Sequence, residues 1–249
     1  MRLKLMTLNL HCLVEDNLEH KQKLISEKIS SLEIDIVLLQ EVAQTRSKGF
    51  IVEDNYGLTL QTLLEELGIK YYYYFEPIKE SFGKYDEGVA ILSRVPLKHV
   101  KSCFLSKSTD YSNWKTRKLL VYEFDSEKTI FLATTHFGWT DEIEVFEDQF
   151  GIANELLIKE QFAILAGDFN VTPNSKEYNH IKEKGWNDLF DNEDYRDFPT
   201  FKSDDANSIT EQRIDYILTN FLPVIIKQEI LFTEEMVSDH YGVFCEIEI

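Results

Sequence analysis

The chain has 249 residues, of which 43% are hydrophobic and 13% aromatic, and we expect residues 1–249 to form a single large domain. Its 26 basic and 44 acidic residues give a formal charge of −18, which disfavours nucleic acid as a partner without excluding it. Three widely spaced cysteines predict reduced thiols and no disulfide framework. No apolar run reaches the length of a membrane span, so we expect a cytoplasmic protein, and no protein partner is implied.

Stretches rich in Val, Ile, Tyr and Phe predict strands, and longer stretches with a 3.6-residue apolar period predict helices. In chain order the expected elements are strand 2–9, helix 19–32, strand 35–40, helix 57–67, strands 70–75, 88–93, 97–104, 118–124 and 129–135, helix 145–159, strand 162–166, helix 175–184, and strands 213–219, 223–231 and 241–248. Much of the polar sequence falls in the expected loops 43–56, 76–86, 106–116 and 193–210. Two packed sheets flanked by helices fit this order best.

Polar side chains stand where several of these strands end. After the buried strand 162–166 come Asp168 and Asn170, which an extended chain places on one side. Each such residue has a structural explanation on its own: a turn, a solvated edge, or, for Asp215, a partner for Arg213. The further members of the set are Asn9, Glu41, His136, Asp215, Asp239 and His240. Their recurrence predicts that they share one rim of a layered fold.

The chemistry of this set is specific. Its carboxylates and amides are hard oxygen ligands, which hold Mg²⁺ or Mn²⁺ in preference to zinc. The sequence has no motif for a nucleophilic serine or cysteine, so water is the expected attacker. Together with two imidazoles and Arg117, such a cluster would suit attack on a phosphate ester.

Seven segments, in this order, resemble the endonuclease/exonuclease/phosphatase superfamily: "TLN" (7–9), "LLQEV" (38–42), "EGVAILSR" (87–94), "TTH" (134–136), "GDFN" (167–170), "RIDYI" (213–217) and "SDHYGV" (238–243). The resemblance spans nearly the whole chain. It implies an α/β fold, a four-layer αββα sandwich with two central mixed β-sheets. The superfamily includes metal-dependent nucleases, inositol-polyphosphate phosphatases, sphingomyelinases and small-molecule phosphatases.

The resemblance also implies metal and catalytic roles. Glu41 would be the main metal carboxylate, with Asn9 and Asp239 as further ligands. Asp168 would orient or deprotonate the attacking water, and Asn170 would hold a phosphoryl oxygen or a second metal.

The remaining implied roles belong to the imidazoles and the phosphate. His240 would be the second imidazole of the site, with its tautomer fixed by Asp215. His136 would contact the phosphate or protonate the leaving oxygen, and Glu87 would pair with it. Tyr85 and Arg117 resemble residues that contact the phosphate.

Departures from other branches bear on the substrate. His11 stands where apurinic nucleases commonly have an acid, and the Pro-x-Trp-x-Asp-Arg motif of inositol phosphatases is absent. By elimination and by net charge, we expect a phosphomonoesterase of a small phosphorylated metabolite such as a sugar phosphate. The segments "TLNLHCLVED", "KYDEGVAILS" and "GDFNVTP" also resemble the bacterial branch that contains maltose 6'-phosphate phosphatase.

Three alternatives stay open at this point. One is a Mg²⁺-dependent nuclease of the same superfamily, and the others are a lipid phosphodiesterase and a non-enzymatic binding module that kept the fold. A nuclease would require a basic groove and steeply salt-dependent binding. The side chains available for that groove are Lys79, Lys84, Arg94, Lys107, Lys115 and Arg117.

Overall fold

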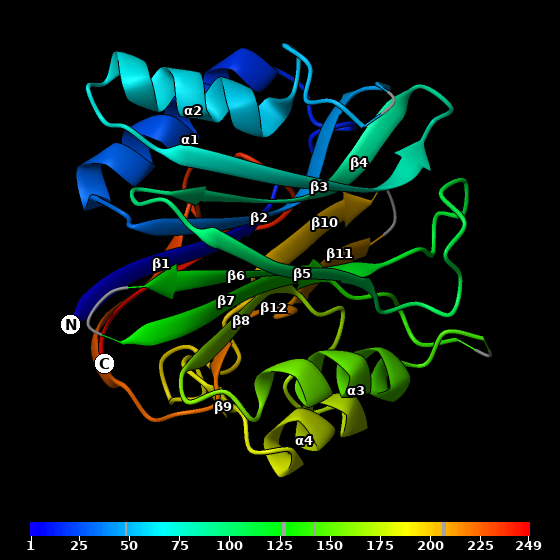
Figure 1. The fold of residues 1–249 in the computed structure, drawn as a ribbon, viewed down its shortest axis with the longest axis vertical. Helices are drawn as coiled ribbons and strands as arrows, with labels where there is room; N and C mark the ends of the chain where they lie inside the picture. Colours follow the sequence, from blue (N-terminus) through cyan, green and yellow to red (C-terminus); the bar gives the residue numbers. More distant parts are fainter. Residues whose placement is uncertain (48, 126–127, 142, 206–207) are drawn as a thin grey trace.

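Two six-stranded β-sheets face each other at the centre of the molecule, and a pair of helices covers the outer face of each (Figure 1). This arrangement is seen in a computed structural model that describes residues 1–47, 49–125, 128–141, 143–205 and 208–249. The four layers confirm the predicted αββα sandwich.

The first sheet has the strand order β13-β14-β1-β2-β4-β3. Only β1 and β2 run parallel, and the other neighbours are antiparallel, so the sheet is mixed as predicted. The bounds of its strands are β1 Arg2–Asn9, β2 Ile36–Thr45, β3 Tyr72–Ser81, β4 Tyr85–Ser93, β13 Val224–Leu231 and β14 Gly242–Glu248.

The second sheet has the order β5-β6-β7-β8-β12-β9, with β7 and β8 as its parallel pair. Its strands are β5 Lys98–Phe104, β6 Lys118–Asp125, β7 Thr129–His136, β8 Ala163–Asp168, β9 Asn187–Asp188 and β12 Asp215–Thr219. A separate two-stranded ribbon consists of β10 Phe201–Asp205 and β11 Ser208–Gln212.

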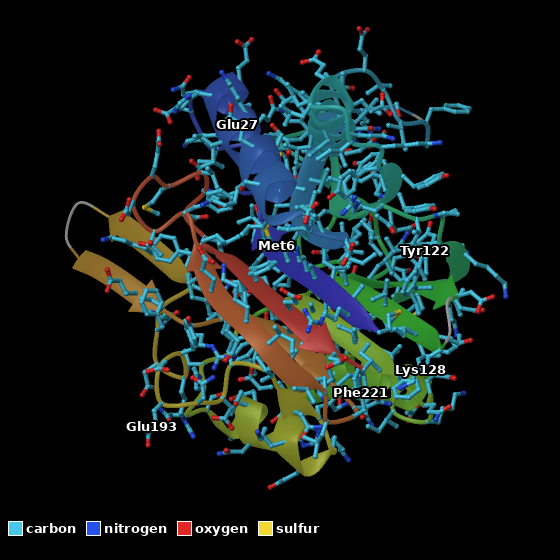
Figure 2. The ribbon with its side chains drawn as sticks, turned by 90° about the vertical axis from the view of Figure 1, so that its left-hand side faces the viewer. Met6, Glu27, Tyr122, Lys128, Glu193 and Phe221 are labelled. Carbon is cyan, nitrogen blue, oxygen red and sulfur yellow. The ribbon has the colours of Figure 1, made fainter. Side chains whose placement is uncertain are left out.

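Three apolar layers hold the sandwich together, and the alternation of side chains along β1 shows how. Met6 and Leu8 pack towards the helices on the outer face, whereas Leu3 and Leu5 pack between the sheets. The outer helices are α1 Leu18–Leu32 and α2 Tyr56–Glu66 on the first sheet, and α3 Phe146–Leu157 and α4 Lys176–Glu183 on the second. Figure 2 shows Met6 within the molecule and the exposed Glu27 at its periphery.

Three predicted loops are partly strand, and those predictions were wrong there. Strand β2 continues to Thr45, and β3 and β4 extend through most of 76–86 as a hairpin. The ribbon β10–β11 begins inside 193–210. In 76–86 and 193–210 charged residues interrupt the apolar alternation, although backbone pairing does not require apolar residues. In β2 the register shift between Leu39 and Val42 breaks the period of two. Residues 48, 206 and 207, in the predicted loops 43–56 and 193–210, lie outside the described residues.

None of the helices in the described part of the chain combines the length and the apolar content needed to cross a membrane.

Candidate active site

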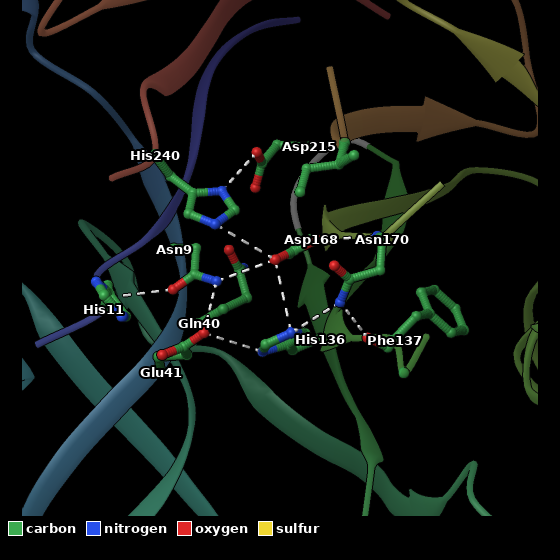
Figure 3. A network of polar contacts seen from close by, with 12 residues as sticks. Asn9, His11, Gln40, Glu41, His136, Phe137, Asp168, Asn170, Asp215 and His240 are labelled. Atoms are coloured by element: carbon green, nitrogen blue, oxygen red, sulfur yellow. Dashed lines mark hydrogen bonds and ion pairs between the residues drawn. The ribbon is translucent and has the colours of Figure 1, made fainter. Parts of the chain in front are cut away.

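The ends of the parallel strands meet across the two sheets. Asn9 ends β1, whereas His136 and Asp168 end the neighbouring strands β7 and β8 and face each other in the ladder. Asn9 Nδ2 donates a hydrogen bond to Asp168 Oδ2 at 3.0 Å, which joins one sheet to the other (Figure 3). The predicted common rim is therefore present, and it contains residues from distant parts of the chain.

Glu41 reaches this rim because β2 bulges. The register of β2 against β4 shifts between Leu39 and Val42, and Glu41 has a φ of 50°. A bulge of this kind turns a side chain out of its regular alternation. The Glu41 carboxylate accepts a hydrogen bond from Asn9 Nδ2 at 3.0 Å and lies 3.7 Å from His136 Nδ1. Burial raises the pKa of Glu41, and the nearby charge of Glu87 adds to the rise.

Asp168 is a buried acid at the centre of the cluster. One of its oxygens accepts the backbone N–H of Asn170 at 2.9 Å, and the other lies 3.5 Å from His136 Nε2 and 3.7 Å from His240 Nε2. Burial raises the pKa of Asp168 to about 7; the charge of Asp215 adds to this effect, and His240 opposes it. The carboxyl group can therefore change its protonation state near neutral pH, as a group that handles a proton from water must do.

Asp215 and His240 form a buried ion pair. His240 Nδ1 lies 2.8 Å from Asp215 Oδ2, and Thr200 Oγ1 donates to the same oxygen at 2.7 Å. Burial opposes the charge of the imidazole, but Asp215 and Asp168 outweigh it and raise the pKa of His240 to about 10. Arg213 forms its ion pair with Asp188, at 2.6 Å, and not with Asp215. The partner of Asp215 is therefore His240.

His136 and Asn170 make a second, neutral contact. Asn170 Nδ2 lies 3.1 Å from His136 Nε2 and also donates to the carbonyl of Phe137 at 2.8 Å. Burial lowers the pKa of His136 well below 6.5, and the positive charges of Arg117 and Lys79 lower it further. Because the amide donates to Nε2, the neutral ring carries its proton on Nδ1, on the side of Glu41.

Asp239 lies at the outer edge of the cluster, and the sequence did not identify its partners. Its Oδ1 is 3.3 Å from His11 Nδ1 and 3.9 Å from His240 Nε2, and its backbone N–H donates to Glu15 at 3.1 Å. The only signal for His11 was its position, two residues after Asn9.

Of the residues predicted to contact the phosphate or to support that contact, Arg117, Glu87 and His136 line one pocket, whereas Tyr85 does not line it. Glu41 lines this pocket as well. Within the described residues Glu87 has no ion pair with His136; it binds Lys79 at 2.9 Å and accepts a hydrogen bond from Ser81. Tyr85 begins β4, partly exposed, and its role stays a prediction.

Lys79 lines the same pocket but was predicted only as part of a nucleic-acid groove. Strand β3 is irregular between Pro77 and Lys79. A lone lysine in a charged hairpin gives no sequence signal of such a position.

The cluster fits a hard divalent cation. The carboxylates of Glu41 and Asp239 and the carboxamide oxygen of Asn9 are hard oxygen atoms of the kind such a cation would take as ligands, and burial raises the pKa of both acids. Burial without full pairing is costly for a carboxylate, and a cation would relieve that cost. In the described part of the chain, two groups have ligand atoms within 4.8 Å of one another: His11, Glu15 and Asp239, and Asp168, Asp215 and His240.

A four-layer sandwich with buried carboxylates and imidazoles at the joined edges of its sheets offers the groups that metal-assisted hydrolysis of a phosphate ester needs. The sequence comparison agrees: the model of the Endonuclease/Exonuclease/phosphatase family matches residues 6–240. The chain therefore belongs to this family, whose members are hydrolytic enzymes acting on phosphoester bonds. No match was found among curated proteins.

Solved structures share the fold at low sequence identity. An endonuclease/exonuclease/phosphatase family protein from Leptotrichia buccalis aligns with a TM-score of 0.90 and 24% identity over 99% of this chain and 100% of its own. TDP2 from D. rerio, complexed with single-strand DNA product, aligns with a TM-score of 0.72 and 16% identity over 100% of this chain and 99% of its own. The human Nocturnin catalytic domain with bound sulfate aligns with a TM-score of 0.70 and 21% identity over 99% of this chain and 93% of its own.

Proposed function

We propose that this chain is a Mg²⁺- or Mn²⁺-dependent phosphomonoesterase of a small phosphorylated metabolite, such as a sugar phosphate. The observation that carries the proposal is the contact between Asp168, Asn9 and the two histidines across the sheets. It places an acid of raised pKa beside hard oxygen ligands and next to the pocket of Arg117.

Each residue of the site has a separate role in the proposed reaction. Glu41, Asn9 and Asp239 would hold the cation, which would polarise a phosphoryl oxygen and stabilise the charge that develops on it. Asp168 aligns a water molecule and takes its proton as the water attacks phosphorus.

The other groups act on the phosphoryl and leaving oxygens. His240, kept protonated by Asp215, stabilises negative charge on the phosphoryl group. Asn170 and Arg117 hold the remaining oxygens, and His136, whose Nδ1 carries a proton, contacts the phosphate or the leaving oxygen.

A nuclease is the second candidate, because TDP2, one of the structures of similar fold, was solved with single-strand DNA product. The charge distribution argues against it. Of the six basic residues available for a groove, four have a carboxylate partner within 4.0 Å: Lys79, Arg94, Lys107 and Lys115. Arg117 is buried. Such pairing leaves little free positive charge to replace the counterions of a nucleic acid.

A substrate panel tests the proposal. The wild-type protein is incubated with phosphate monoesters, short single-stranded DNA and phospholipid vesicles, each with Mg²⁺, with Mn²⁺ and with a chelator. We expect inorganic phosphate from one or more sugar phosphates, only with metal, and incorporation of ¹⁸O from labelled water into that phosphate. Cleavage of DNA without release of phosphate from any monoester would overturn the proposal in favour of the nuclease.

A further inference from the structure

A small second cleft, with room by itself for about one water molecule, adjoins the phosphate pocket, and Arg117 lines both. Its walls come from two segments: residues 105–117, between β5 and β6, supply Trp114, and residues 137–141, after β7, supply Gly138 and Trp139. The two tryptophans are 61% and 52% exposed. Two exposed indole rings beside a polar cleft offer flat apolar faces on which the ring of a ligand can stack.

The phosphate pocket itself fixes the position of Trp114. The backbone carbonyl of Trp114 accepts a hydrogen bond from Arg117 Nη1 at 2.7 Å and another from Lys79 Nζ at 3.4 Å. Trp114 also lines the open mouth of the site with Glu41 and Lys79. The backbone of Trp114 is therefore anchored beside the pocket, near the point where the alcohol part of a bound phosphate ester would leave it.

A buried hydrogen-bond donor lies at the base of the cleft. Arg117 Nε is buried, and in the described part of the chain it has no hydrogen-bond partner. A Cβ atom added to Gly138 would lie 3.2 Å from Gln149 Nε2 and 3.7 Å from this nitrogen, so a side chain at position 138 would crowd the base of the cleft. A buried donor without a partner is costly, and a bound oxygen atom would satisfy it.

Polar groups beside the indoles restrict the ligand. Lys115 Nζ lies 5.5 Å from the centre of the Trp114 ring and forms an ion pair with Asp141. Hydrogen bonds from Lys115 and from backbone N–H groups lower the pKa of Asp141, so its carboxylate is an ionised acceptor for hydroxyl groups. The carboxylates of Asp141 and Glu144 line the cleft and would repel a second phosphate.

We propose that Trp114 and Trp139 form a subsite for the alcohol part of the substrate, and that this part is the ring of a sugar. The C–H face of a pyranose would stack on an indole, while its hydroxyl groups would reach Asp141 and Lys115. The two tryptophans are then specificity-determining residues. This inference rests on the proposed function and narrows its substrate class.

The kinetic test compares a substrate that has a ring with one that lacks it. For Trp114→Ala and Trp139→Ala, we expect the ratio of kcat/KM for glucose 6-phosphate to that for glycerol 3-phosphate to fall about tenfold, mainly through KM. Trp114→Phe should restore most of the ratio, because phenylalanine keeps an aromatic face. Phe50→Ala, at another exposed aromatic residue, is the matched control. Equal ratios in the wild type and both alanine variants would overturn the subsite.

A fluorescence measurement separates this inference from the proposed function, since it needs no turnover. The chain has three tryptophans, and the third, Trp186, is 1% exposed and donates to Asn154 at 2.9 Å. In Asp168→Asn, glucose 6-phosphate should change the tryptophan emission, and most of that change should disappear when Trp114→Phe and Trp139→Phe are added. No change in emission overturns the subsite, and a larger change with adenosine 5'-monophosphate overturns the assignment to a sugar. Absence of phosphate release from every monoester by the wild type would count against the proposed function alone.

Discussion

At the scale of single residues, the site depends on neighbouring groups whose pKa values move in different directions. The carboxyl of Asp168 titrates near 7 and His240 near 10, while His136 stays neutral. One buried region therefore contains an acid that can take a proton and an imidazole that stays charged. Such a separation of pKa values is typical of acid–base sites.

These values predict a bell-shaped dependence of kcat/KM on pH. The attacking water needs Asp168 ionised, so the rate should rise with pH through about 7; it should fall through about 10 as His240 loses its proton. Because the two groups interact, the limbs report the pair rather than each residue alone. A bound divalent cation favours the carboxylate, so more Mg²⁺ should move the acidic limb to lower pH.

The variant Asp215→Asn tests whether His240 sets the alkaline limb of the pH profile. Asp215 is the largest cause that raises the pKa of His240, so its removal should move the alkaline limb to lower pH. Steady-state kinetics from pH 5 to 11 measure both limbs. An alkaline limb that is unchanged in Asp215→Asn would show that His240 does not set it.

Single residues were predictable from the sequence where a short strand ends directly in a polar group. Asp168 and Asn170 follow this pattern, as does His136. The partners of Glu87 and the place of Lys79 were not predictable, because they depend on which long side chains meet across a hairpin. Ion-pair partners of this kind are chosen by tertiary geometry.

At the scale of elements, irregular backbone positions deliver the functional groups. Glu41 and Asn170 both have a positive φ, 50° and 53°, a conformation that costs free energy in residues with a side chain. In a regular strand, the side chain of Glu41 would follow the alternation between the two faces of the sheet. The bulge in β2 turns this side chain to another direction. A sequence pattern of period two cannot reveal a bulge, which is why β2 was predicted to end before Glu41.

Gly167 shows how tightly β7 and β8 approach beside the site. A Cβ atom there would lie 2.0 Å from the carbonyl oxygen of Thr135, and the φ of Gly167 is +150°. We predict that Gly167→Ala lowers the free energy of unfolding by about 1–3 kcal/mol, the usual cost of an overpacked position. Urea denaturation followed by circular dichroism measures the change.

Gly151→Ala is the control for that variant. Gly151 lies within α3, and an added Cβ would have no neighbour within 4 Å. Alanine should raise the free energy of unfolding there by about 0.4–1 kcal/mol. A neutral effect of Gly167→Ala would contradict the close approach of β7 and β8.

At the scale of the whole molecule, the fold joins groups that lie far apart in the sequence. Asn9 and Asp168 are 159 residues apart and share a hydrogen bond across the sheets. The four-layer architecture was predictable from the resemblance and from the number of strands. The meeting of particular side chains was not, because it depends on how one sheet is placed against the other.

The metal site should couple to the stability of the whole chain. A cation that binds only the folded state stabilises it by RT ln(1 + [L]/Kd), about 2.7 kcal/mol at a hundredfold excess over Kd. We predict that Mn²⁺ raises the thermal midpoint of the wild type and of Glu65→Gln, an exposed acid on α2. Glu41→Gln should lose most of the shift. An equal shift in all three proteins, measured by calorimetry, would rule out Glu41 as a ligand.

We propose that the cluster of Asn9, Glu41, His136, Asp168 and His240 at the strand ends is the centre that hydrolyses phosphate esters. Its most direct test is kcat for phosphate release in Asp168→Asn and His240→Ala, with the surface variant His20→Ala as control. We predict that kcat falls by about 10²–10⁴ in each cluster variant, that the fold persists by circular dichroism, and that the control matches the wild type. Wild-type kcat in either folded cluster variant would contradict the claim.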